Sequence, residues 1–217
     1  MVTCCQCEGI EKQFGRRTAA FELHRFRKRG ARRTTHFLID ALRREGVEGA
    51  SVLDIGGGVG AIHHELLASG AREAVHVDIS LDYLSAAREE AERRGHAARV
   101  EFVRADFVEA APTLAESDVV TLDRVICCYP DMERLVALAA GKTRQLLGAV
   151  YPREVWWMHL LVAAVNVFSR VRRSAFRTYV HPPSAIDAVI RRHGLERRAF
   201  RRTLGWEVAV YRRPVAG

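Results

Sequence analysis

The sequence contains few cysteines, and their arrangement does not suit a disulfide framework. Five cysteines occur among 217 residues, in two groups: Cys4, Cys5 and Cys7, and the pair Cys127 and Cys128. Disulfide frameworks use an even number of cysteines and form in oxidising compartments. Cys4 and Cys7 have the spacing of half a zinc site, but no second pair with that spacing follows. We therefore expect a reducing environment and predict no metal ligands. An alternative stays open, in which Cys127 and Cys128 complete a thiolate cluster for zinc or a soft metalloid.

Long apolar runs are also absent. The longest, residues 155–168, has 14 residues and includes His159 and Asn166. A helix that crosses a bilayer needs about 20 apolar residues. The first residues also lack the basic and apolar segments of a secretory signal. We expect a cytoplasmic protein.

Lysine is scarce, although the chain is basic. Only three of the 34 basic residues are lysines, and the formal net charge is +8. Residues 1–50 carry +5, residues 51–169 carry −6 and residues 170–217 carry +9. Basic ends around an acidic centre suit phosphates, an anionic membrane or an acidic substrate, and they also suit an ordinary solvated surface. The charge alone does not decide between these interpretations.

Short apolar runs alternate with helical patterns, which is typical of a parallel sheet covered by helices. We predict an α/β fold of the Rossmann type, with a seven-stranded, mostly parallel sheet, helices on both faces and a C-terminal antiparallel hairpin. The strands are expected at residues 51–55, 74–78, 100–103, 118–122, 145–151, 195–203 and 206–212.

The length suits one domain with a full hydrophobic core. We expect a single domain over residues 1–217 with four parts. They are a basic helical extension (1–33), a cofactor-binding core (34–151), an apolar helical lid or insertion (152–181), and a C-terminal helix and hairpin (182–217).

A glycine loop follows the first predicted strand. Glycines at 56, 58 and 60 allow the backbone to approach a ligand closely, because glycine lacks a Cβ atom and tolerates positive φ. Asp78 ends the second predicted strand, where a carboxylate can accept hydrogen bonds from both hydroxyls of a ribose. The glycine pattern also satisfies the dinucleotide fingerprint, with Ala61 in its last position. However, Asp54 puts a carboxylate just before the loop, which disfavours a pyrophosphate and suits the cationic groups of S-adenosylmethionine.

Four segments resemble the successive motifs of class I S-adenosylmethionine-dependent methyltransferases: residues 52–62, 75–78, 103–107 and 118–131. The resemblance implies that Gly56 and Gly58 line the methionine moiety and that Asp78 holds the ribose. It further implies that Asp54 orients the loop or the amino group of the cofactor. The remaining expected cofactor contacts are Gly60, Ile79, Asp106 and Phe107, the last two beside the adenine.

The segment 122–131 lies where small-molecule methyltransferases similar to those of ubiquinone biosynthesis border the acceptor. The chain also resembles magnesium-protoporphyrin O-methyltransferases more loosely. These resemblances imply in-line methyl transfer (EC 2.1.1.-) to a small, hydrophobic acceptor, most often at oxygen, with alignment as the main contribution of the protein. Candidate bases, useful only for a hydroxyl acceptor, are Asp123, Tyr129, His159 and His181.

Two other functions stay open. The basic termini suit an RNA methyltransferase, but no RNA-binding module is visible, so nucleic acid is not the expected partner. A non-catalytic cofactor-binding protein with this fold is the second alternative.

The segment 152–173 is too apolar for an ordinary surface connection. At helical spacing its apolar arc is wide, so we expect it to be buried. One interpretation is a helix packed on the sheet edge or on a second copy in a homodimer. The preferred one is a lid over the acceptor pocket, with Arg170, Arg172 and Arg173 available to a membrane surface or to substrate carboxylates.

Overall fold

The computed structural model describes residues 9–11 and 13–214 of the chain. They form a seven-stranded sheet with the order β3-β2-β1-β4-β5-β7-β6. Strands β1 to β5 are parallel, whereas β7 is antiparallel to both β5 and β6. The predicted α/β fold with a C-terminal hairpin is therefore confirmed.

The strand bounds agree with the sequence expectation to within two residues. The parallel strands are β1 (Ser51–Ile55), β2 (Glu73–Asp78), β3 (Val100–Arg104), β4 (Ser117–Asp123) and β5 (Thr143–Pro152); the hairpin consists of β6 (Glu196–Arg202) and β7 (Trp206–Arg212). β1 is buried along its whole length because helices cover both of its faces.

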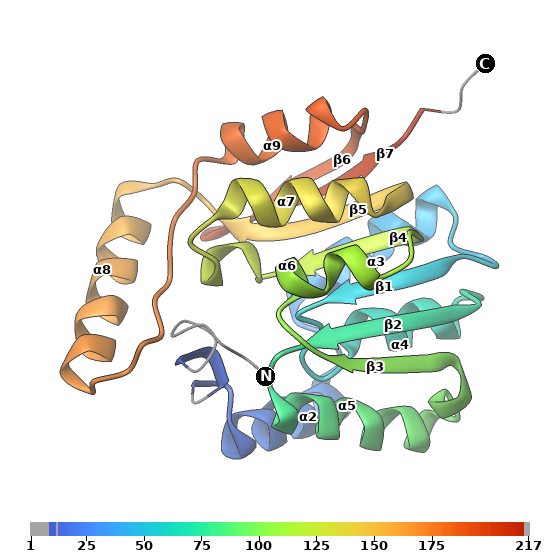
Figure 1. Cartoon of the computed structure of the whole chain (residues 1–217), viewed down its shortest axis with the longest axis horizontal. Helices are drawn as coiled ribbons and strands as arrows, with labels where there is room; N and C mark the ends of the chain where they lie inside the picture. The colour runs from blue at the N-terminus through green and yellow to red at the C-terminus, as the bar shows by residue number, and fades with distance from the viewer. Residues whose placement is uncertain (1–8, 12, 215–217) are drawn as a thin grey trace.

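One layer of helices comprises α6 (Phe107–Ala110), α7 (Met132–Gly141) and α9 (Pro183–Arg192), which lie in front of the sheet in Figure 1. Their apolar side chains form a core cluster with β1, β4, β5 and β7. The opposite face is covered by α3 (Arg33–Glu45) and α4 (Ala61–Ala68), which contribute to a second core cluster. Short 3-10 turns lie at Ala97–Arg99, Ala111–Thr113 and Ile126–Cys128.

The basic helical extension expected over residues 1–33 is helical over most of its described part. Helix α2 (Arg16–Arg29) begins after Gly15, which caps its N-terminus, and ends at Gly30, whose φ is +71°. Glycine adopts this conformation without the steric cost of a Cβ atom, so the chain turns there and starts α3 three residues later. α2 packs against α5 (Leu81–Arg94).

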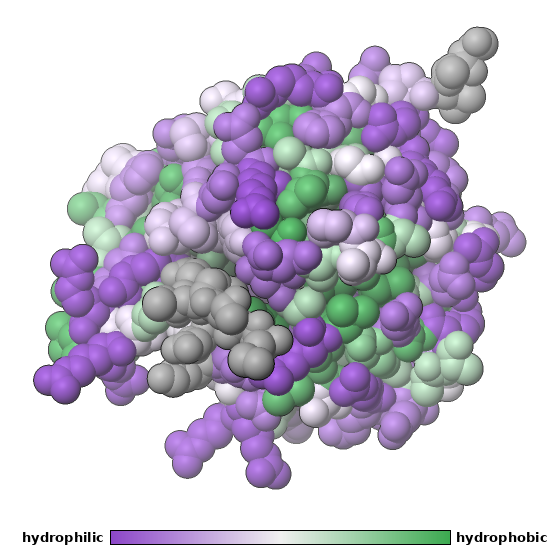
Figure 2. All heavy atoms as spheres, viewed as in Figure 1, coloured by the Kyte–Doolittle hydropathy of each residue, from purple (hydrophilic) through white to green (hydrophobic). Residues whose placement is uncertain are grey.

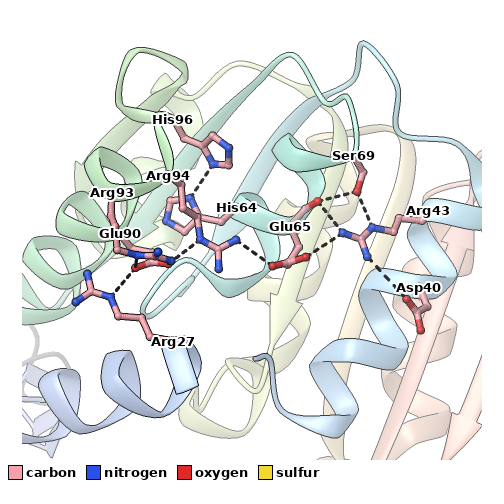
Figure 3. Close-up of polar contacts among 10 residues, drawn as sticks. All are labelled: Arg27, Asp40, Arg43, His64, Glu65, Ser69, Glu90, Arg93, Arg94 and His96. Atoms are coloured by element: carbon pink, nitrogen blue, oxygen red, sulfur yellow. Dashed lines mark hydrogen bonds and ion pairs between the residues drawn. The ribbon is translucent and has the colours of Figure 1, made fainter. Parts of the chain in front are cut away.

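A network of arginines and glutamates holds these helices together (Figure 3). Glu90 of α5 is fully buried and accepts hydrogen bonds from Arg27 of α2 and from Arg93 and Arg94 of its own helix. Burial raises the pKa of Glu90, but these three guanidinium groups outweigh it and hold the pKa well below its usual range. Arg94 also pairs with Glu65 of α4, and Glu65 pairs with Arg43 of α3, so the network connects four helices.

Helix α8 (Trp156–Val171) stands beyond the carboxyl ends of the parallel strands, at the left in Figure 1. The expectation that its apolar arc is buried is wrong for this chain by itself, since only Met158 and Ser169 are buried. The exposed fraction is 76% for Trp156 and 62% for Leu160. Figure 2 shows apolar side chains at the corresponding edge of the molecule. Packing of the whole helix on the sheet edge is therefore excluded within one copy.

None of the helices in the described part of the chain combines the length and the apolar character that crossing a membrane requires.

Candidate active site

A cavity of about 370 Å³ opens at the carboxyl ends of β1, β2 and β4. Parallel α/β sheets bind ligands at this edge, and the volume lies in the range of about 300–1,000 Å³ that is typical of ligand pockets. The glycine loop and the ends of β2 and β4 form one side. Helices α2 and α3 contribute further side chains.

The loop after β1 requires glycine at two positions that face the cavity. Gly56 and Gly58 have φ values of +59° and +57°. A Cβ atom on Gly56 would lie 2.6 Å from Cγ2 of Val125, so a side chain is excluded there by space as well as by conformation. Gly60, with a φ of +80°, caps α4 and is not among the residues that line the cavity.

Asp78, at the end of β2, is held by backbone amides. Its Oδ2 accepts a hydrogen bond from the amide of Gly58 at 3.1 Å, and its Oδ1 accepts one from the amide of Ser80 at 2.9 Å. Burial raises the pKa of Asp78 to about 6, although both amide hydrogen bonds oppose this shift. A carboxylate has about four lone-pair sites, so acceptor capacity remains for two ribose hydroxyls.

The expected adenine side of the cavity contains Ile79, Asp106 and Phe107. Asp106 caps α6, since its Oδ1 accepts a hydrogen bond from the amide of Val108 at 2.9 Å. Its Oδ2 accepts a hydrogen bond from the hydroxyl of Tyr129 at 3.2 Å. Asp106 thus connects the start of α6 to Tyr129 on this side of the cavity.

Asp54 borders the cavity, but both of its carboxyl oxygens already contact other side chains. Its side chain is 1% exposed; Oδ1 accepts a hydrogen bond from the hydroxyl of Thr121 at 2.7 Å, and Oδ2 lies 2.9 Å from Nδ1 of His63. Burial raises the pKa of this carboxyl group, and the positive charge that His76 would carry opposes the shift. This arrangement supports a role in fixing the loop more than direct contact with a ligand.

Asp123, at the end of β4, lies on the other side of the cavity and is already paired. Its Oδ2 accepts a hydrogen bond from the hydroxyl of Thr35 at 2.5 Å, and its Oδ1 lies 3.0 Å from Nε of Arg124. Arg124 has a φ of +62°, a conformation that costs a non-glycine residue about 1–3 kcal/mol and occurs often at ligand sites.

Sequence reasoning missed the contribution of α2 and α3. Glu22, Arg25, Arg32 and Thr35 all line the cavity. Arg32 is paired with Glu22 at 2.5 Å, whereas Nε of Arg25 is buried with no hydrogen-bond partner among the described residues. Burial, and after it the positive charge of Arg32, lower the pKa of Arg25. Glu22 and Arg25 belong to α2, whereas Arg32 and Thr35 follow the turn at Gly30, so no single spacing in the sequence connects them.

The remaining candidate bases have different positions. Tyr129 lines the cavity, but burial and the carboxylate of Asp106 raise its pKa, so the phenol keeps its proton. His181 does not line the cavity and lies 2.9 Å, through Nε2, from the carbonyl oxygen of Tyr129; burial lowers its pKa. His159 lies on the exposed side of α8 and does not line the cavity either.

Both thiols of the Cys127 and Cys128 pair line the cavity, and their sulfur atoms are 3.8 Å apart. The hydrogen bond between them lowers the pKa of Cys127 and raises that of Cys128. The other members of the suggested thiolate cluster, Cys4, Cys5 and Cys7, lie outside the described residues.

Helix α8 is connected to this wall of the cavity by hydrogen bonds. The side chain of Asn166 donates to the carbonyl oxygen of Thr178 at 2.8 Å and accepts from its amide at 2.9 Å. The hydroxyl of Thr178 in turn donates to the carbonyl oxygen of Cys127 at 3.1 Å. The amide of Tyr179 also donates to the carbonyl oxygen of Cys127, at 2.8 Å, so the segment after α8 is fixed to this wall at two adjacent residues.

The combination of strand order, glycine loop and ribose-type carboxylate defines the class I S-adenosylmethionine-dependent methyltransferase fold. Comparison with known families agrees: residues 52–145 match the model described as a methyltransferase domain. Over these residues the chain is therefore similar to methyltransferase domains.

Solved structures share the fold at low sequence identity. Magnesium protoporphyrin IX methyltransferase from Synechocystis PCC 6803, with bound S-adenosylmethionine, has a TM-score of 0.69 and 16% identity; the match covers 96% of this chain and 97% of that one. An O-methyltransferase family protein from Burkholderia thailandensis has a TM-score of 0.69 and 19% identity, covering 94% and 62%. A search of curated proteins finds no match.

Proposed function

We propose that the protein transfers a methyl group from S-adenosylmethionine to an oxygen atom of a small acceptor with a hydrophobic part. The observation that carries this proposal is one cavity lined both by Asp78, a carboxylate placed to bind a ribose, and by Arg25, which has no ion-pair partner among the described residues. The whole chain would act as one domain, with residues 152–181 as an insertion near the acceptor.

The residues fit the cofactor in three respects. Gly56 and Gly58 leave space for the methionine moiety, Asp78 has acceptor capacity for the ribose, and Phe107 gives an apolar surface for the adenine. When bound, S-adenosylmethionine supplies an electrophilic methyl group on a positively charged sulfur. The protein then has to align the acceptor with that methyl group and to exclude water.

The charges of the acceptor side favour a negatively charged oxygen, such as a carboxylate or a phenolate. Arg25 would pair with it, because a guanidinium group at the edge of a cavity is stabilised by an anionic ligand. Asp123 is occupied by Thr35 and Arg124, so it is poorly placed to remove a proton. An acceptor that is already ionised needs no base, which agrees with this arrangement.

The hydrophobic part of the acceptor is inferred from α8. Its exposed apolar face includes Trp156, Leu160 and Phe168, and its end carries Arg170, followed by Arg172 and Arg173. Such a surface suits an acceptor that is delivered from an anionic membrane, with α8 resting at the interface. The hydrogen bonds through Asn166 and Thr178 would transmit its position to the cavity.

Two measurements test this function. Calorimetric titration with S-adenosylmethionine should give one site per chain. Incubation with radiolabelled S-adenosylmethionine and a fractionated extract should then label a small, lipid-soluble molecule. Label in RNA would favour the nucleic-acid alternative, and cofactor binding without labelling of any fraction would favour a non-catalytic role.

A further inference from the structure

Four histidines form a buried cluster beside the glycine loop. His63 and His64 of α4 and His76 of β2 are fully buried, and His96 is 8% exposed. Nδ1 of His63 lies 2.9 Å from Oδ2 of Asp54 and 3.4 Å from Nδ1 of His76. His64 packs against His63, with ring centroids 4.2 Å apart, and its Nδ1 lies 3.3 Å from Nδ1 of His96 (Figure 3). The mechanism above uses none of these imidazoles.

Hydrogen bonds alone do not satisfy this cluster. A neutral imidazole nitrogen has either one proton or one lone pair, so Nδ1 of His63 can fully satisfy Asp54 or His76 but not both. Buried polar atoms are almost always paired, so the Nδ1 atom that His63 shares between Asp54 and His76 calls for an explanation.

The carboxyl group of Asp54 also has few partners that could balance a negative charge. Its carboxyl group is buried, and the ion pairs among the described residues connect it only to His63. No arginine or lysine of the described residues forms an ion pair with it.

We propose that Asp54, His63 and His76 bind a divalent transition-metal ion, for which Zn²⁺ is the natural probe. One ligand atom from each of the three residues lies within 4.8 Å of the others. Ligand atoms bound tetrahedrally to zinc at about 2.0–2.2 Å lie about 3.3 Å apart, close to the 2.9 Å and 3.4 Å found here. Two histidines and a carboxylate are a common set of ligands for such ions.

Gly57 shows how closely the cluster approaches the loop. A Cβ atom on Gly57 would lie 2.7 Å from Oδ2 of Asp54 and 2.8 Å from Nδ1 of His76. The loop backbone therefore borders the proposed ion directly, and Gly57 also lines the cavity. An ion bound by Asp54, His76 and His63 would connect β1, β2 and α4, which are the elements next to the glycine loop. It would act as a structural ion beneath the cofactor site.

Metal content gives the direct test, and it does not depend on the proposed methyl transfer. We expect purified protein, or metal-free protein after addition of Zn²⁺, to hold one equivalent that survives gel filtration. His63→Gln and His76→Gln should each weaken Zn²⁺ binding at least tenfold. His96→Gln is the matched control, because it replaces a buried histidine of the neighbouring pair, and it should change binding less than twofold.

Two further measurements separate this site from the cysteines and from misfolding. In a variant with Cys4, Cys5, Cys7, Cys127 and Cys128 replaced by serine, Co²⁺ should still bind and give visible bands without thiolate charge transfer. For the wild-type protein, a chelator should lower the melting temperature and Zn²⁺ should restore it. The proposal would be overturned if the wild-type protein bound neither Zn²⁺ nor Co²⁺, or if His63→Gln bound as much metal as the wild type. It would also be overturned if the cysteine-free variant bound no metal.

Discussion

Oδ2 of Asp78 accepts a hydrogen bond from the amide of Gly58 at 3.1 Å, which joins the end of β2 to the middle of the glycine loop. The residue proposed to hold the ribose thus also fixes the loop proposed to face the methionine moiety. A substitution at Asp78 tests both roles at once.

For Asp78→Asn we expect cofactor affinity to fall by about 2 kcal/mol, roughly 30-fold, because the ribose hydroxyls lose a charged acceptor. The amide oxygen can still accept the hydrogen bond from Gly58, so the fold should be retained. Calorimetric titration with S-adenosylhomocysteine measures the change, and Asp82→Asn in the next helix is the control. Unchanged affinity in folded Asp78→Asn would remove Asp78 from the site.

The pKa of Asp78 predicts a pH dependence with a defined sign. Burial raises this pKa to about 6, so in the absence of cofactor the folded protein retains a proton there that the unfolded chain has lost above about pH 4. The contribution of Asp78 to folding stability should therefore be full below pH 4 and should decline as the pH rises to 6. Cofactor affinity should change in the opposite direction, since the ribose needs the carboxylate. Titrations between pH 5 and pH 8 should show the decline below pH 6 in wild type and a flat profile in Asp78→Asn.

Arg25→Gln should raise the acceptor KM by at least tenfold, because a charged hydrogen bond to the acceptor is lost, while cofactor affinity stays within about threefold. Arg29→Gln, one turn later on the exposed side of α2, is the control. Initial rates against the labelled extract fraction measure the effect. Equal rates in the two variants would contradict an anionic acceptor held by Arg25.

Trp156→Ser combined with Leu160→Ser should leave the melting temperature within a few degrees of wild type, since both side chains are exposed in this chain. The same variant should lose activity toward acceptor in vesicles of anionic lipid, and Leu204→Ser, an exposed leucine of the β6–β7 turn, should not. Trp157 is left unchanged because its ring packs close to Gly205. A large loss of stability would instead indicate that α8 is buried between two copies.

Glu90→Ala should destabilise the fold by about 3 kcal/mol or more, because three arginines lose a buried partner. Its neighbour Glu89 pairs with Arg27 at 2.8 Å but is 61% exposed, so Glu89→Ala should cost less than about 1 kcal/mol. Urea unfolding measures both. If Glu90→Ala lowered the free energy of unfolding as little as Glu89→Ala, the network in Figure 3 would contribute little to stability.

The sequence was informative where local backbone geometry brings residues together. Gly56, Gly58 and Asp78 could be predicted to line one cavity, because a strand, a tight turn and a second strand end impose their spacing. Arg25 and Thr35 could not, because α2 and α3 precede the sheet and only tertiary packing brings them to the cavity. The histidine cluster was missed for a related reason. His63 and His76 belong to different elements with no motif spacing, and their meeting depends on the parallel pairing of β1 with β2.

At α8, periodicity correctly located a helix, but it carries no information about what covers an apolar face. The expected burial is wrong within one chain, and burial against a second copy stays a prediction.

The position of β7 has a consequence for the order in which the sheet is assembled. β6 is synthesised before β7, yet β7 lies between β6 and β5. β6 therefore has no edge to join until its successor has left the ribosome, and the two strands must be added together as a hairpin. Until then the side of β5 that later pairs with β7 is open to other strands. A nascent chain halted after β6 should consequently be far more prone to aggregation than one that has completed β7.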